Sequence, residues 1–124
     1  MQGLHLTADL HNCRCDATWL VDAAQLSDWC VKAVDAAGLT ALTSISQLYQ
    51  AVPDAGSASI TLLLAGSHVC VHTWPAQKVV ALDVYVCNIG GDQSTRARAL
   101  MQALVERFSP EWTEQRSLDR GDES

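Results

Sequence analysis

Several short stretches of this chain alternate between apolar and polar residues, and this period of two limits its fold more than any other feature. In residues 4–10 the even-numbered positions are apolar and the odd-numbered ones are polar. The same alternation runs through residues 68–73 and 79–87. Successive side chains of a strand point to opposite faces of a sheet, so the pattern predicts strands with one buried face.

Two other segments repeat at the helical spacing of i, i+3 and i+4. The apolar residues of 26–37 follow this spacing, and Gly38 is suited to end a helix there. Residues 94–108 show it again, and Pro110 stops the second helix. The remaining expectations are strands at 39–49 and 59–64, an edge strand at 111–116, a turn at 52–56 and a frayed polar tail at 117–124.

Two helices and five or six strands joined by short turns favour a mainly antiparallel sheet with both helices packed on one face. This is an α+β two-layer sandwich. The 124 residues suit one domain, covering 1–124.

The charge of the chain excludes some classes of partner. Eight Lys and Arg against 14 Asp and Glu give a net charge of −6, which disfavours binding to nucleic acid or to anionic membranes. The first residues carry no basic, apolar leader, and no apolar run reaches the roughly 18 residues of a membrane helix. We therefore expect a cytoplasmic protein whose five cysteines are mostly reduced.

Reactive side chains gather on the face of the sheet opposite the apolar one. The period of two assigns these residues to it: His68, Cys70, His72, Asp83, Tyr85 and Cys87. Such a face can be solvated, lie in an oligomer interface, or form a site. The spacing H-x-C-x-H could hold a metal ion if a further ligand came from elsewhere. Ser67 beside two histidines could be a nucleophile, although no G-x-S-x-G motif surrounds it.

Residues 64–87, LAGSHVCVHTWPAQKVVALDVYVC, resemble the core signature of the prokaryotic S-adenosylmethionine decarboxylase family. The matching elements are Ser67-His68, then His72-Thr73-Trp74-Pro75, then the spaced set Ala81, Asp83, Tyr85 and Cys87. Ser59 stands eight positions before Ser67, where the family has another serine. The likeness is weaker over the rest of the chain.

The resemblance implies a self-processing proenzyme cut between Gly66 and Ser67 into chains 1–66 and 67–124. Ser67 would attack the carbonyl of Gly66, with Ser59 stabilising the tetrahedral intermediate, and His72 would remove the α-proton of Ser67. Residue 67 would become a covalent pyruvoyl group that forms a Schiff base with the substrate amine and takes up the electrons of decarboxylation. Cys87 would then return a proton as general acid. We expect no metal site in this chain, and the resemblance implies a role in polyamine and spermidine biosynthesis and a homodimer.

Two departures from the family pattern concern the substrate. Gly66 and Ala76 stand where the family usually has glutamates, and a methyl group at 76 cannot bind ribose hydroxyls. An alternative substrate is therefore L-ornithine or L-arginine, with Asp9 or Asp83 holding the distal charge. The resemblance otherwise implies S-adenosylmethionine as substrate, with these additional candidates for substrate contact: Tyr49 on the adenine, His68 and Trp74. A chain that is not cut, either binding metal or acting as a partner subunit, is the remaining alternative.

Overall fold

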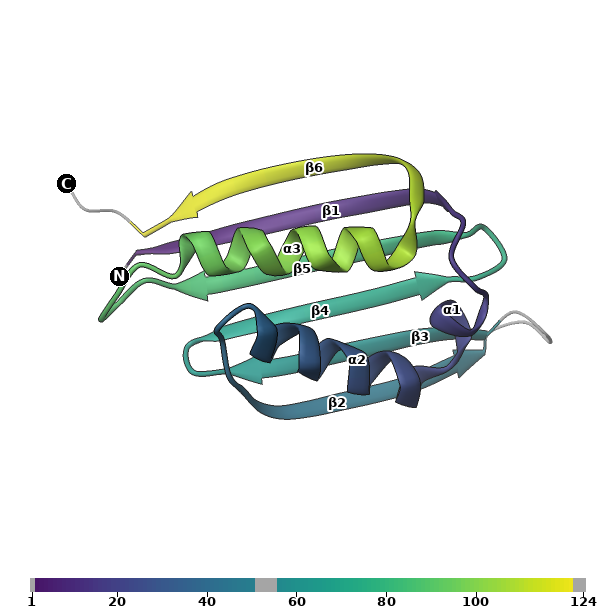
Figure 1. Cartoon of the computed structure of the whole chain (residues 1–124), viewed down its shortest axis with the longest axis horizontal. Coiled ribbons are helices and arrows are strands. Elements are labelled where there is room, and N and C mark those ends of the chain that lie inside the picture. The colour runs from purple at the N-terminus through teal and green to yellow at the C-terminus, as the bar shows by residue number, and fades with distance from the viewer. Residues whose placement is uncertain (1, 51–55, 122–124) are drawn as a thin grey trace.

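A computed structural model describes residues 2–50 and 56–121 of the protein (Figure 1). One six-stranded sheet has the order β2-β3-β4-β5-β1-β6, and every neighbouring pair of strands is antiparallel. The strands are β1 (Gly3–Cys13), β2 (Ala41–Gln50), β3 (Gly56–Leu64), β4 (Ser67–Trp74), β5 (Val79–Cys87) and β6 (Pro110–Arg120). The helices are α1 (Thr18–Val21), α2 (Ala23–Ala36) and α3 (Ser94–Phe108).

The helices form one layer on one side of the sheet, which confirms the α+β sandwich. Helix α2 lies over β2 and β3, and α3 runs along β5 and β1 (Figure 1). The strands contribute to the core the side chains that the alternation predicted, among them Leu6, Val71 and Val84, each at most 5% exposed. Helix α3 covers them with Leu100, Leu104 and Phe108, which are fully buried.

The other side of the sheet carries no helix, and we call it the open face. It is formed by the odd-numbered residues of β1, β3 and β5 and by the even-numbered residues of β4 and β6, which alternate with the core residues. All the reactive residues assigned to this face by the sequence lie on these positions. The open face also exposes large apolar side chains, among them Leu63, Trp74, Trp112 and Leu118.

The structure differs from the sequence-based expectation at three places. A third helix, α1, precedes α2; Asp16 accepts hydrogen bonds from the backbone and hydroxyl of Thr18 at its start, both 3.0 Å long. Residues 117–120 are not frayed, because β6 continues to Arg120 along β1. Residues 52–55 of the expected turn lie outside the described residues, and Gly56, which we expected in that turn, is the first residue of β3. No helix in the described part of the chain is long and apolar enough to cross a membrane.

Candidate active site

Ser67 follows directly on a two-residue hairpin turn. Strands β3 and β4 pair Leu64 with Ser67, so Ala65 and Gly66 alone make the turn, and Gly66 has a φ of +64°. The Oγ of Ser67 accepts a hydrogen bond of 3.0 Å from the backbone N–H of Cys87 at the end of β5. The hydroxyl is thereby fixed next to the peptide bond that joins residues 66 and 67.

Cys87 lies against the same turn. A Cβ atom placed on Gly66 would be 3.5 Å from the Cβ of Cys87 and 4.0 Å from its Sγ. This thiol is partly exposed, whereas Cys30 is fully buried in the core. Burial raises the pKa of Cys30 to about 12, which leaves that thiol protonated and inert. The described cysteines are all free, in agreement with the expectation of reduced thiols.

A hollow of about 300 Å³ opens beside Ser67 and Cys87 at this end of the sheet. It is lined by the loop after α2, by the turn and by the segment before α3: Gly38, Leu39, Thr40, Leu42, Leu64, Ala65, Ser67, Cys87, Ile89 and Gln93. The lining contains no carboxylate among the described residues. The space accommodates a small group at position 67 but offers no anionic partner for a cationic side chain.

Ser59 and His72 form a second pair on neighbouring strands. They are direct partners in the register of β3 and β4, and Ser59 Oγ lies 3.0 Å from Nδ1 of His72. The ring of His72 is tilted against that of Trp74, with 6.3 Å between the centroids. Trp74, 44% exposed on the open face, could therefore form a wall beside this pair.

The two pairs lie at opposite ends of β4. His72 is five positions after Ser67 on a continuous strand, which places their Cα atoms about 16 Å apart at roughly 3.3 Å per residue. One chain thus joins Ser59 to His72 and Ser67 to Cys87, but it does not bring the pairs together. The family resemblance implies that all four act on the same residue, and a single chain does not bring the two pairs to one place.

Between the two ends, the open face carries a cluster around Tyr85. The His68 ring lies 5.5 Å from the Tyr85 ring, and the guanidinium carbon of Arg120 lies 4.9 Å above it. His5 Nε2 is 2.8 Å from Oδ1 of Asp83. The sequence reasoning missed Arg120, because it lies in a segment that lacks any apolar pattern. The alternation of β1 did assign His5 to the polar face, and that signal could have identified it.

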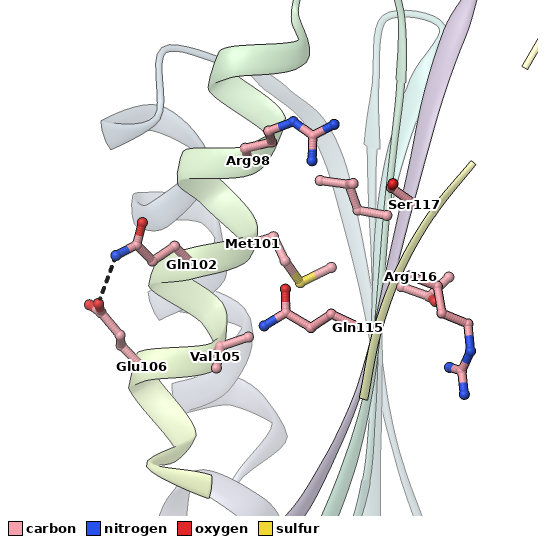
Figure 2. A pocket seen from close by; sticks show the side chains of 10 residues that line it. Arg98, Met101, Gln102, Val105, Glu106, Gln115, Arg116 and Ser117 are labelled. Atoms are coloured by element: carbon pink, nitrogen blue, oxygen red, sulfur yellow. Dashed lines mark hydrogen bonds between the residues drawn. The ribbon is translucent and has the colours of Figure 1, made fainter. Parts of the chain in front are cut away.

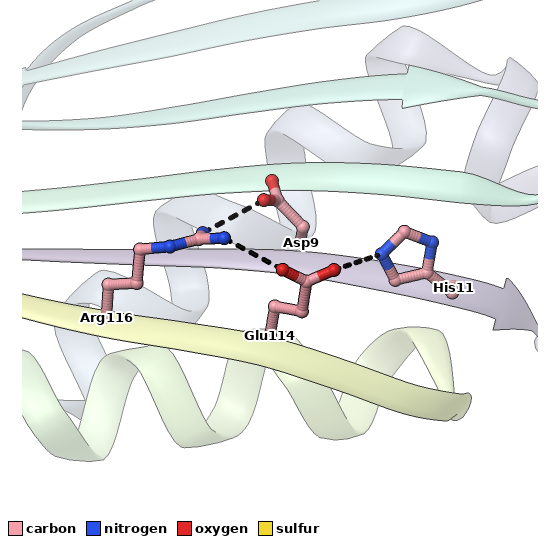
Figure 3. Close-up of polar contacts among 4 residues, drawn as sticks. All are labelled: Asp9, His11, Glu114 and Arg116. Carbon is pink, nitrogen blue, oxygen red and sulfur yellow. Dashed lines mark hydrogen bonds and ion pairs between the residues drawn. The ribbon is translucent and has the colours of Figure 1, made fainter.

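Asp9 belongs to a network between β1 and β6 (Figure 3). Arg116 donates to Asp9 at 3.1 Å and to Glu114 at 2.8 Å, and the far oxygen of Glu114 lies 3.6 Å from Nε2 of His11. Asp9 and Asp83 are therefore both occupied, one by a guanidinium and the other by the imidazole of His5. Tyr49 pairs through its backbone with Ser57, but its side chain lies outside the described residues.

The metal alternative is not supported. Among the described residues, no group of three or more His, Cys, Asp or Glu side chains could hold a metal ion. His68, Cys70 and His72 extend along one strand, and the Sγ of Cys70 lies 3.7 Å from the hydroxyl of Thr61. A straight strand separates successive ligands by about 6.6 Å, which is too far for one ion without curvature.

A larger groove of about 530 Å³ lies elsewhere, between α3 and β6 (Figure 2). Met101 and Val105 face into it from the helix and Gln115 from the strand, while Gln102 donates to Glu106 at 3.1 Å. The groove contains none of the serines, histidines or cysteines selected from the sequence. It is separate from the site at Ser67.

Comparison with known proteins gives a consistent result. The family model described as S-adenosylmethionine decarboxylase matches residues 4–121. The S-adenosylmethionine decarboxylase proenzyme of Hydrogenobaculum sp. (strain Y04AAS1) is 35% identical over 120 residues, covering 96% of this chain and 81% of its own. The proenzyme of Picrophilus torridus is 34% identical over 119 residues, covering 96% and 84%. The crystal structure of the adenosylmethionine decarboxylase of Aquifex aeolicus superposes with a TM-score of 0.81 at 28% identity, covering 98% of this chain and 92% of the other.

Proposed function

Because this chain belongs to the S-adenosylmethionine decarboxylase family, we propose that it is a proenzyme that cuts itself and then decarboxylates S-adenosylmethionine. The observation that carries the proposal is the placement of Ser67. Its hydroxyl accepts a hydrogen bond from the N–H of Cys87 next to a tight turn. The Cys87 thiol lies close to Gly66, the residue that precedes Ser67 across the bond to be cut.

The first step of the proposed cut is a transfer of the Gly66 acyl group. A bond forms from Ser67 Oγ to the carbonyl carbon of Gly66, the bond from that carbon to the Ser67 nitrogen breaks, and the hydroxyl proton passes to this nitrogen. The ester so formed is then opened by elimination. A base takes the α-proton of Ser67, the Cβ–Oγ bond breaks, and Gly66 leaves as a carboxylate. The remaining double bond shifts to an imine, and water replaces the nitrogen as ammonia.

The product at position 67 is a pyruvoyl group. Its carbonyl is an electrophile for the substrate amine and accepts the electron pair that stays behind when carbon dioxide leaves. The hollow next to Ser67 has room for it. Cys87 then acts as the proton donor, because its partly exposed thiol lies close to Gly66, the residue next to position 67.

The base and its serine partner come from a second copy of the chain in our proposal. Ser59 and His72 are a formed pair, yet they lie about 16 Å from Ser67 of their own chain. A two-fold axis over the open face turns the two ends around, so that His72 of one copy approaches the end of the sheet where Cys87 and the bond between Gly66 and Ser67 of the other copy lie. The exposed Leu63, Trp74 and Leu118 support this packing, because burying them is favourable. The proposed assembly is therefore a homodimer with two shared sites.

The proposed substrate contacts are His68 and Trp74, with Tyr49 on the adenine, as the family resemblance implies. For L-ornithine or L-arginine the sequence offered Asp9 and Asp83, and both carboxylates are already paired within the chain. The proposed place of action is the cytoplasm, where free cysteines persist. The product would enter polyamine and spermidine synthesis.

Mass spectrometry of the purified chain tests the proposal. We expect two fragments divided between residues 66 and 67, the second without a free amino terminus, and Ser67→Ala should stay intact. Carbon dioxide release from S-adenosylmethionine, L-ornithine and L-arginine, measured side by side, should occur with the first alone. An intact chain that hydroxylamine does not cut would refute the self-cleavage, and release from a basic amino acid would refute the substrate.

A further inference from the structure

Gly66 combines two properties at the bond that the proposed function cuts. Its φ of +64° lies in the left-handed region, which glycine adopts without strain. There is also room for a side chain, because the nearest atoms to an added Cβ are 3.5 Å and 4.0 Å away, both in Cys87. A substitution would therefore strain the backbone without pushing the turn apart.

The strain would act on the carbonyl that is attacked. In the left-handed conformation an L residue brings its Cβ too close to the carbonyl oxygen that follows it. At position 66 that carbonyl accepts the bond from Ser67 Oγ, with the hydroxyl proton moving to the nitrogen that leaves. Attack makes the carbon tetrahedral and turns the oxygen away from its place in the turn, which relieves the crowding. Strain of this kind raises the energy of the uncut chain more than that of the transition state.

We propose that Gly66 sets the speed of self-cleavage, and that its glycine makes the cut slower than any L residue would. The inference rests on the proposed function, since it concerns the rate of the same cut. The inference adds that the rate of cleavage is low because the turn at Gly66 is unstrained, and that one side chain at this position would raise the rate.

The test compares the first-order rate of cleavage of purified, freshly refolded chains. We expect Gly66→Ala to be cut about fivefold faster than the unmodified chain, the factor given by relief of ordinary left-handed strain. Gly66→Asn should fall between them, because asparagine tolerates the left-handed region better than alanine although it is larger. An effect of side-chain size alone would reverse this order.

Gly90 provides the matched control. It has a φ of +86° and nothing within 4 Å of an added Cβ, but it lies outside the turn that is cut. Gly90→Ala should leave the rate unchanged. In a Ser67→Ala background, where the chain stays whole, Gly66→Ala and Gly90→Ala should lower the melting temperature to a similar extent.

The outcomes separate the two proposals. If the unmodified chain is cut and Gly66→Ala is cut no faster, or Gly66→Asn is cut faster than Gly66→Ala, the role of Gly66 is refuted while self-cleavage stands. If Gly66→Ala does not lower the melting temperature, the strain is absent and the inference fails. If no chain is cut, the proposed function fails, and the inference fails with it.

Discussion

The hydroxyl of Ser59 lies 3.0 Å from Nδ1 of His72, across the hairpin of β3 and β4 and far from the turn that ends it. A hydrogen bond at that position orients the imidazole, so the ring is prepared to act on a group presented from outside its own chain. In the proposed reaction, one copy of the protein therefore supplies the nucleophile Ser67 and the other copy supplies the base His72.

Complementation between two inactive variants follows from this separation. Ser67→Ala and His72→Ala should each remain uncut alone, because one lacks the nucleophile and the other lacks the base. When the two are unfolded and refolded together, the His72→Ala chain should be cut, since its Ser67 meets a His72 from the other copy. Mass spectrometry distinguishes the chains by their masses. Cleavage of neither chain in the mixture would show that no partner supplies the base.

Cys87→Ser should divide the two activities. The hydroxyl is a far weaker acid than the thiol, so decarboxylation should fall by about 10²–10⁴-fold. Cleavage at Ser67 should continue, because the N–H of Cys87 that holds Ser67 Oγ belongs to the backbone. Carbon dioxide release per cut chain measures the effect, and the buried Cys30→Ala serves as a control with full activity. An active Cys87→Ser enzyme would remove Cys87 from the mechanism.

Thr73 should matter for stability although its side chain points into the core, away from the face that carries His72. It is 1% exposed; its hydroxyl accepts from the N–H of Ala58 at 2.8 Å and donates to the carbonyl of Leu20 at 2.7 Å. Thr73→Val leaves the N–H of Ala58 and the carbonyl of Leu20 without this hydroxyl partner, which should lower the free energy of unfolding by about 2 kcal/mol. Urea denaturation in the Ser67→Ala background measures this. Thr61→Val, on the open face, should change the value by less than about 0.5 kcal/mol.

Alkaline pH should destabilise the fold through its buried thiols. Burial raises the pKa of Cys30 from its ordinary 9.0 to about 12. Between these values the folded chain keeps a proton that the unfolded chain has lost, so the free energy of unfolding falls as pH rises. Urea denaturation from pH 8 to pH 11 should show this decrease, and Cys30→Ala should make it shallower. Equal slopes for the two chains would contradict the assignment to Cys30.

Local patterns were enough to predict most of the fold. The period of two identified the buried face of three strands, and the helix at residues 94–108 was predicted with the bounds that it has. Helix α1 was missed because four residues are too few to show a period. The end of β6 was missed because it is exposed on both faces, so no apolar pattern distinguishes it from a tail.

The candidate site was predictable in its pairs but not in its arrangement. A two-residue turn at 65–66 pairs Leu64 with Ser67 and thereby fixes the register of the whole hairpin. Counting the same number of residues back along both strands pairs Ser59 with His72, so their contact follows from the turn. The contacts of Asp9 with Arg116 and of Tyr85 with Arg120 depend on β1 lying between β5 and β6. These strands are far apart in the sequence, and no local pattern encodes their order.

The order of the strands also decides what a cut at residue 66 would do to the molecule as a whole. Residues 1–66 contain β1, β2 and β3, and residues 67–124 contain β4, β5 and β6. Strand β1 is hydrogen-bonded on one side to β5 and on the other to β6, so a strand of the first fragment lies between two strands of the second. After the cut the two fragments would stay associated, because separating them would break three rows of backbone hydrogen bonds, those of β1 with β5, β1 with β6 and β3 with β4. Once unfolded, however, the two fragments of one protomer would have to meet by diffusion before the protomer could refold, whereas the uncut protomer folds as a single chain.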